Sequence, residues 1–269
     1  MAVNNISIFV LTWFVWGEKV APKMKIQKRS LGSLVGGHAL FLTILSVIVS
    51  SLAQAQPTLD VTLSNGANTW EWHPAIVNTT NGYVVNDVSY NPSGVKIDLY
   101  DTTIAFDPFV SASVNVQNNT AVVQTYILTV TLPVPAIPGA SVMGGSTQGG
   151  VTDANFSGAG TVSTVPGVSL YYGRIDGANV LSLFPDPHSI TVVFAGGSTN
   201  ESANAGLPGL TIPGPAVTTS IGIQHEFTLT PGDIATFSSF FGVEQAIPEP
   251  ASFSLLAVGG LVLLFRRRR

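Results

Sequence analysis

The sequence predicts an all-β protein, a two-sheet antiparallel sandwich of jelly-roll or immunoglobulin-like type, with a closed barrel as the alternative. After residue 56, Val, Thr, Ile, Phe and Tyr dominate, and Gly, Pro, Asn and Asp break the chain at intervals of about eight to twelve residues. No helical periodicity extends over three turns between residues 56 and 245. These observations predict about ten to twelve short strands in one domain.

The clearest strand is predicted at Val122–Leu132, where apolar residues alternate with threonines. A period of two with one apolar face indicates a half-buried strand of an antiparallel sheet. Phe109–Val116 alternates in the same way, and Asn118 and Asn119 lie between the two segments. Because asparagine tolerates positive φ, this spacing predicts a tight hairpin at Asn118-Asn119.

The C-terminal part of this region predicts two more strands, Ile221–Leu229 and Ile234–Phe241, joined by a turn at Pro231-Gly232-Asp233. The glycine-rich segments 144–150 and 196–214 are predicted to be surface loops. Further strands are predicted at 58–63, 83–89, 95–106, 168–173, 179–184 and 189–194.

The domain at 56–245 is strongly acidic, although the whole chain has a formal charge of only −4. Thirteen acidic residues and two basic ones, Lys96 and Arg174, give residues 56–247 a charge of −11. Such a surface argues against nucleic acid as a partner, because binding to phosphates requires Lys and Arg. It favours solubility, and it is compatible with divalent cations.

Signatures of catalysis are missing from the sequence, and we expect a protein that is not an enzyme. It has no cysteine, no G-x-S-x-G and no H-E-x-x-H, so nucleophile elbows, thiolate sites and zincin sites are excluded. His225 falls on the apolar face of its predicted strand and is interpreted as a hydrogen-bonded core histidine. A glycosidase-like carboxylate pair stays open, since such pairs assemble from distant strands.

Calcium is the one cofactor that the carboxylates suggest, and no residue is assigned as a metal ligand. The candidates are Asp98, Asp101, Asp107 and Asp186. Asp98 and Asp101 are three residues apart, so on a regular strand they would point to opposite faces. No D-x-D-x-D-G loop occurs, and we expect no bound cofactor.

Trp70 and Trp72, in the sequence Trp-Glu-Trp-His-Pro, are the candidate carbohydrate contacts. Both would lie on one face of a strand. The alternative interpretation, which we favour, is that this face belongs to the core.

Residues 24–55 are predicted to be a signal peptide. Basic residues after Met24 precede the apolar segment Ala39–Val49, and Ala53-Gln54-Ala55 supplies the small-x-small cleavage site. We expect export through the Sec translocon and cleavage by signal peptidase after Ala55. Residues 1–23 are interpreted as an extension from a start codon assigned too early, or as part of an unusually long signal.

The segment 246–269 predicts a short membrane helix. Ala251–Phe265 contains fifteen uncharged residues, which as a helix span about 22 Å at about 1.5 Å per residue. A bilayer core is about 30 Å thick, so the span is marginal. Arg266, Arg267, Arg268 and Arg269 would stop transfer and stay cytoplasmic, which places the acidic domain outside the inner membrane.

Pro248, Glu249 and Pro250, the apolar helix and the terminal arginines together resemble the PEP-CTERM sorting signal of exopolysaccharide-producing Gram-negative bacteria. The resemblance implies transient anchoring in the inner membrane and processing by an exosortase near Pro248–Pro250, although a permanent anchor stays open. It also implies delivery to the cell surface or extracellular matrix. There we expect the domain to act through surface contacts, either with the exopolysaccharide of a biofilm or through cations. The alternative is a secreted carbohydrate-binding or carbohydrate-active domain.

Overall fold

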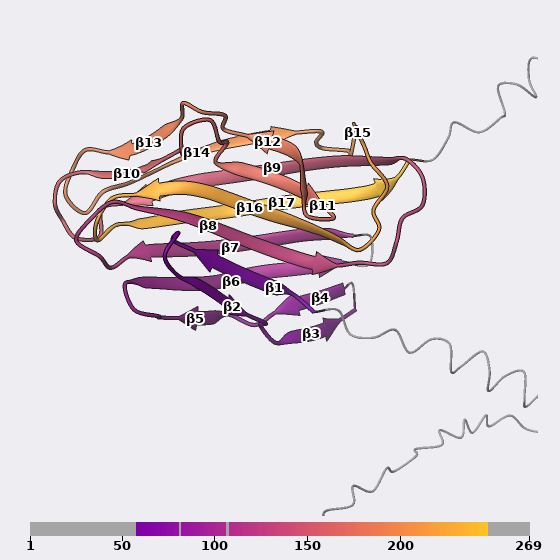
Figure 1. Cartoon of the computed structure of the whole chain (residues 1–269), viewed down its shortest axis with the longest axis horizontal. Coiled ribbons are helices and arrows are strands. Elements are labelled where there is room, and N and C mark those ends of the chain that lie inside the picture. Colours follow the sequence, from indigo (N-terminus) through magenta and orange to yellow (C-terminus); the bar gives the residue numbers. More distant parts are fainter. Residues whose placement is uncertain (1–57, 81, 106–107, 247–269) are drawn as a thin grey trace, which may run out of the picture. The chain divides into compact units, whose positions relative to one another are not determined.

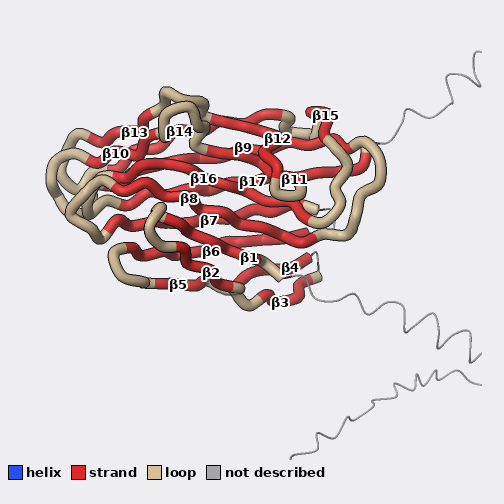
Figure 2. Tube along the Cα trace, in the orientation of Figure 1, coloured by secondary structure: helices blue, strands red, loops and turns tan. Residues whose placement is uncertain are grey.

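The computed structural model describes residues 58–80, 82–105 and 108–246. Strands, turns and loops account for all of these residues, and none of them is helical (Figures 1 and 2). The predicted all-β class is confirmed: the strands form two sheets in which every pairing is antiparallel. The predicted signal helix and C-terminal helix lie outside the described residues.

One sheet has eight strands: β1 (Asp60–Ser64), β2 (Thr69–Trp72), β8 (Gln124–Pro133), β10 (Gly160–Ser163), β11 (Tyr171–Ile175), β12 (Ala178–Leu183), β13 (Ser189–Val192) and β16 (Ser220–Leu229). Its strand order is β12–β11–β16–β8–β1–β2. In addition, β10 pairs with β16 and β13 pairs with β10.

The other sheet has nine strands: β3 (Ile76–Thr79), β4 (Gly82–Val85), β5 (Val88–Tyr90), β6 (Val95–Ala105), β7 (Phe109–Asn118), β9 (Ser141–Thr152), β14 (Ser198–Ala205), β15 (Ile212–Gly214) and β17 (Ile234–Gln245). Its strand order is β14–β9–β17–β7–β6–β4–β3, with β15 beside β9 and β5 beside β6.

The core lies between the two sheets, and the alternation of the sequence builds it. Along β7 every second side chain is buried, as it is along most of β8 and β16. Phe227 of the eight-stranded sheet packs on Phe237 of the nine-stranded sheet, with ring centroids 4.9 Å apart. The two sheets therefore share one hydrophobic core, as expected for a sandwich.

The predicted hairpin at Asn118-Asn119 is wrong, because the chain changes sheets at this point. The strand β7 pairs with β6 and β17, whereas β8 pairs with β1 and β16. Asn118 is fully buried, and its side-chain amide donates to the carbonyl oxygens of Val122, Leu229 and Thr230 at 2.9, 3.0 and 3.2 Å. The side chain thus ties the β7–β8 connection to the turn between β16 and β17.

The glycine-rich segments predicted to be loops are also largely strands. Residues 144–150 lie inside β9, and residues 196–214 contain β14 and β15. Glycine is needed in β9 because neighbouring side chains approach its backbone closely. A Cβ atom at Gly145 would lie 2.7 Å from the hydroxyl oxygen of Tyr171. Composition therefore indicated loops where close packing against the opposite sheet requires glycine.

A bulge in β6 corrects the expected orientation of two aspartates. The register of β6 with β7 shifts between Tyr100 and Thr103, and Asp101 has a φ of 46°. Buried positions fall at odd numbers before the bulge and at even numbers after it. Asp98 and Asp101 were expected on opposite faces of the sheet. The bulge instead puts both on the outer face, where Asp98 is half-buried and Asp101 is exposed.

Candidate functional site

Trp70 and Trp72 lie on β2, at the edge of the eight-stranded sheet, and they face the interior. In the antiparallel register, Trp70 pairs with Leu63 and Trp72 pairs with Val61. Leu63 and Val61 are fully buried, and directly paired residues share a face of the sheet. Both indoles are half-buried and pack against the core.

Trp72 closes one open side of the sandwich by contacting the other sheet. Its ring stacks on Tyr90 of β5, with centroids 5.7 Å apart and an interplanar angle of 25°. The indole nitrogen is buried without a hydrogen-bond partner. One face of the ring is thus occupied by a protein aromatic, which leaves less of it for a sugar.

The outer side of β2 carries polar groups. Nδ1 of His73 lies 2.8 Å from a carboxylate oxygen of Asp60, and its Nε2 lies 3.9 Å from Glu71. The side chain of His73 is well exposed. An exposed polar contact of this kind contributes little to stability, and the three residues offer no arrangement for nucleophilic catalysis.

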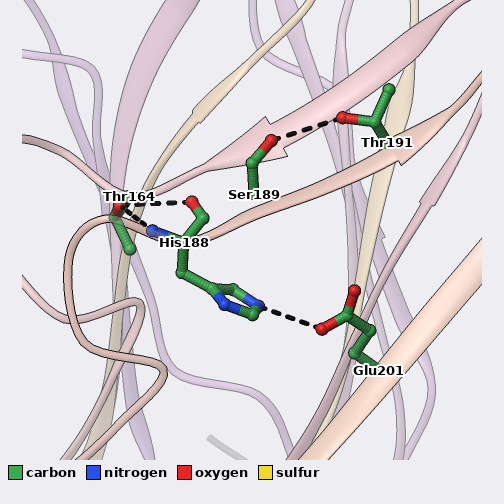
Figure 3. Close-up of polar contacts among 5 residues, drawn as sticks. All are labelled: Thr164, His188, Ser189, Thr191 and Glu201. Carbon is green, nitrogen blue, oxygen red and sulfur yellow. Dashed lines mark hydrogen bonds and ion pairs between the residues drawn. The ribbon is translucent and has the colours of Figure 1, made fainter.

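A second polar cluster links the two sheets near the start of β13 (Figure 3). Nε2 of His188 lies 3.3 Å from Glu201 on β14. The backbone N–H of His188 donates to the hydroxyl of Thr164 at 3.0 Å, and that hydroxyl lies 2.8 Å from Asp186. The His188 ring also stacks on Phe184, with centroids 4.4 Å apart. The cluster fixes the loop before β13, but it aligns no nucleophile.

His225 is a core histidine, as the sequence predicted. It is 2% exposed, and its ring stacks on Phe237 with centroids 4.2 Å apart. Burial lowers the pKa of His225 to about 3, and the hydrogen bond to the carbonyl of Leu170 offsets this only in part. The ring is therefore neutral and inaccessible.

The aspartates considered for calcium are engaged separately. Asp98 accepts a hydrogen bond from Lys96 at 2.8 Å; burial raises its pKa, but hydrogen bonds from Lys96 and Ser89 hold the value below its ordinary range. Asp186 accepts from the backbone of Gly167 at 2.9 Å. Asp107 lies outside the described residues. Across 58–80, 82–105 and 108–246, no group of three or more His, Asp or Glu side chains is placed to hold a metal.

Asp153 and Asp233 carry no functional prediction from the sequence, although both are fully buried. A signal for Asp153 was present, since Asp153–Gly158 reads Asp-Ala-Asn-Phe-Ser-Gly, with oxygen-bearing side chains at alternate positions before a glycine. No local signal pairs it with Asp233. Their proximity follows from the register of β9 with β17, which joins residues far apart in the chain.

The sequence motifs for sorting lie outside the described residues. This applies to Ala53, Ala55, Pro248–Pro250 and Arg266–Arg269. Within the part of the chain that the structure describes, no helix is long and apolar enough to cross a membrane.

One segment of the chain matches a known family model. Residues 246–269 match the family model of the PEP-CTERM protein-sorting motif. No curated protein matches the chain. Among solved structures, the chain is similar to TmCBM61 in complex with β-1,4-galactotriose, at 15% identity over 60% of this chain and 88% of that chain, with a TM-score of 0.24. A similarity this distant carries no information about what this chain binds.

Proposed function

We propose that this chain, whose residues 246–269 match the PEP-CTERM sorting motif, is an exported, non-enzymatic protein of the cell surface or extracellular matrix. It is secreted through the Sec translocon, held briefly in the inner membrane by its C-terminal helix, and processed by exosortase. The observation that carries this proposal is the position of the motif, which begins immediately after β17 ends at Gln245.

The boundaries of the sandwich fit removal of both ends. The last strand, β17, is a central strand between β9 and β7, and its pairing with β9 extends to Gln245. The backbone N–H of Ala246 still donates to Ala140 at 3.0 Å. A cut near Pro248 therefore leaves every described strand in place. At the other end, cleavage after Ala55 precedes β1, which begins at Asp60.

The acidic domain would act through surface contacts, including association with exopolysaccharide. Its charge of −11 over residues 56–247 keeps it soluble and limits self-association. Two further observations favour a non-enzymatic role over a carbohydrate-active one. His225 is committed to the core, and the indoles of Trp70 and Trp72 face inward.

Mass spectrometry of the mature protein from its native host tests the proposal. We expect an N-terminus at Gln56 and a C-terminus near Pro248. A Glu249→Ala variant should retain its tail, whereas Glu244→Ala, which changes an exposed residue of β17, should be processed normally. Surface-located protein that still ends at Arg269 would contradict exosortase cleavage and establish a permanent anchor.

A further inference from the structure

The loop after β9 presents oxygen atoms in a calcium-loop pattern. Asp153, Asn155 and Ser157 alternate along it, and Gly158 follows with a φ of 91°. The carboxylate of Asp153 accepts hydrogen bonds from the backbone N–H of Ser157 at 3.0 Å and of Gly158 at 2.8 Å. Calcium loops of the D-x-[DN]-x-[DN]-G type place ligands at the first, third and fifth positions and require glycine at the sixth. This loop departs from that motif at the fifth position, where Ser157 replaces Asp or Asn.

A second carboxylate reaches this loop from the turn between β16 and β17. Thr152, the last residue of β9, pairs with Ile234, the first residue of β17. Asp153 and Asp233 therefore lie at adjacent positions just beyond the paired strands. The connections that carry them lie at the same end of the sheets (left in Figure 2). The amide nitrogen of Asn155 also donates to the carbonyl of Pro231, which ties the loop to the turn.

Asp233 carries the observation that points to a ligand. The residue is 0% exposed, and its Oδ1 atom is buried without a hydrogen-bond partner. Its Oδ2 atom accepts a hydrogen bond from the hydroxyl of Thr230. Burial raises the pKa of Asp233, and the neighbouring carboxylate of Asp153 adds to this, whereas the hydroxyl of Thr230 and the backbone N–H of Ala154 lower it in part. A buried carboxylate oxygen left unpaired beside another carboxylate is unfavourable, because nothing replaces its lost hydration.

No basic side chain of the described residues is free to neutralise this pair. Lys96 and Arg174 are the only lysine and arginine of residues 58–246. Lys96 pairs with Asp98, and Arg174 donates to the carbonyl of Gly177. The carboxylate of Asp153 is stabilised by the backbone N–H groups of Ser157, Gly158 and Gly196, which donate to it at 3.0, 2.8 and 3.3 Å. Oδ1 of Asp233 has no hydrogen-bond partner, and a cation or a proton from solution can supply one.

We propose that Asp153, Asn155 and Asp233 form a calcium site, with Ser157 and backbone carbonyls completing the shell. Carboxylate, amide and carbonyl oxygens are the ligands that Ca²⁺ takes, usually six to eight in flexible geometry. Soft and borderline metals are disfavoured because no Cys or His belongs to the set. The bound ion joins the loop after β9 to the turn before β17, and so fastens one end of the sandwich.

Thermal unfolding of the purified full chain tests the site, measured in EDTA and then with about 5 mM Ca²⁺, above the range typical of extracellular modules. Calcium should raise the melting temperature by about 5 °C, because a ligand that binds only the native state stabilises it. Magnesium should have a smaller effect, and calorimetric titration should give one Ca²⁺ per chain.

The variant Asp233→Asn distinguishes a calcium site from a pair of buried aspartates that binds no metal. In EDTA the variant should melt at or above the temperature of the wild type, because one of two adjacent buried charges is gone. Added calcium should no longer raise it. Asn155→Ala changes an exposed residue and should need about tenfold more calcium for the same shift. Asp101→Asn, at an exposed carboxylate elsewhere, should keep the full shift.

Two results would overturn the proposal. The first is a wild-type melting temperature that neither calcium nor chelator changes, which would mean that the two aspartates share a proton instead. The second is an equal calcium shift in Asp233→Asn and the wild type, which would place the ion elsewhere.

Discussion

Nε2 of His225, on β16, lies 2.9 Å from the hydroxyl oxygen of Ser239, on β17, and this contact joins the two sheets through the core. The other ring nitrogen lies 3.2 Å from the carbonyl oxygen of Leu170. A neutral imidazole satisfies both contacts if Nδ1–H donates to Leu170 and Nε2 accepts from Ser239. The hydroxyl of Thr147 lies 2.8 Å from Ser239 and extends the network into β9.

This buried ring makes stability depend on pH in a defined direction. The pKa of His225 is about 3 in the folded chain, against 6.5 for an unperturbed histidine, so the unfolded chain binds the proton first. The stabilisation is complete above about pH 6.5 and is lost as the pH falls toward 3. Between pH 7 and 5, urea unfolding should show a loss of about 2 kcal/mol attributable to this residue.

The variants His225→Gln and His73→Gln test whether His225 causes this dependence of stability on pH. His225→Gln should be less stable at pH 7 but should lack this part of the pH dependence. His73→Gln, at an exposed ring, should keep the slope of the wild type. An unchanged slope in His225→Gln would show that another group is responsible.

Asn118 and Asn119 are adjacent, but we expect the same substitution to lower the free energy of unfolding strongly at Asn118 and hardly at all at Asn119. Asn118→Asp should lower the free energy of unfolding by about 3 kcal/mol or more, since a buried carboxylate would face three carbonyl oxygens. Asn119 is exposed. Asn119→Asp should therefore stay within about 0.5 kcal/mol of the wild type. Equal effects in chemical denaturation would argue against the buried amide as the link between the two connections.

Gly173 allows the sheets to approach each other. A Cβ atom at Gly173 on β11 would lie 2.4 Å from ring carbons of Phe241 on β17. Gly173→Ala should lower stability by about 2 kcal/mol, because the ring can only give way by disturbing the core. Gly209→Ala is the matched control, since no atom lies within 4 Å of the added carbon. A neutral Gly173→Ala in thermal unfolding would contradict this packing.

Substitutions at Trp72 distinguish packing from carbohydrate contact. Trp72→Ala should destabilise the chain by about 2 kcal/mol, because it removes a half-buried ring and its stacking on Tyr90. Trp72→Phe should recover most of this loss, and Glu71→Ala, at an exposed neighbour, should have little effect. Cosedimentation with exopolysaccharide from the host should be unchanged in Trp72→Phe. Loss of cosedimentation in that folded variant would favour the carbohydrate-binding alternative.

Much of the strand content could be read from the sequence. The alternation at Val122–Leu132 and Ile221–Leu229 marks β8 and β16, and most of the apolar positions on them are buried. Ile127 is only half-buried, and Val122 and Val123 precede β8 and are exposed. The core position of His225 followed from the same period of two. The PEP-CTERM motif was equally local, since its three parts lie next to one another at 246–269. The assignment to a jelly-roll or immunoglobulin-like type, and the two terminal helices, stay predictions.

The sequence by itself thus determined the class of fold and the sorting signal, because side-chain alternation and a contiguous motif are properties of neighbouring residues. Only the tertiary structure decided which strands pair, since backbone hydrogen bonds are alike in every strand and the choice depends on distant contacts. For that reason Asn118 proved to be a link between sheets, and the glycines at 144–150 proved to lie in a strand. For the same reason the adjacency of Asp153 and Asp233 became visible only in the register of β9 with β17.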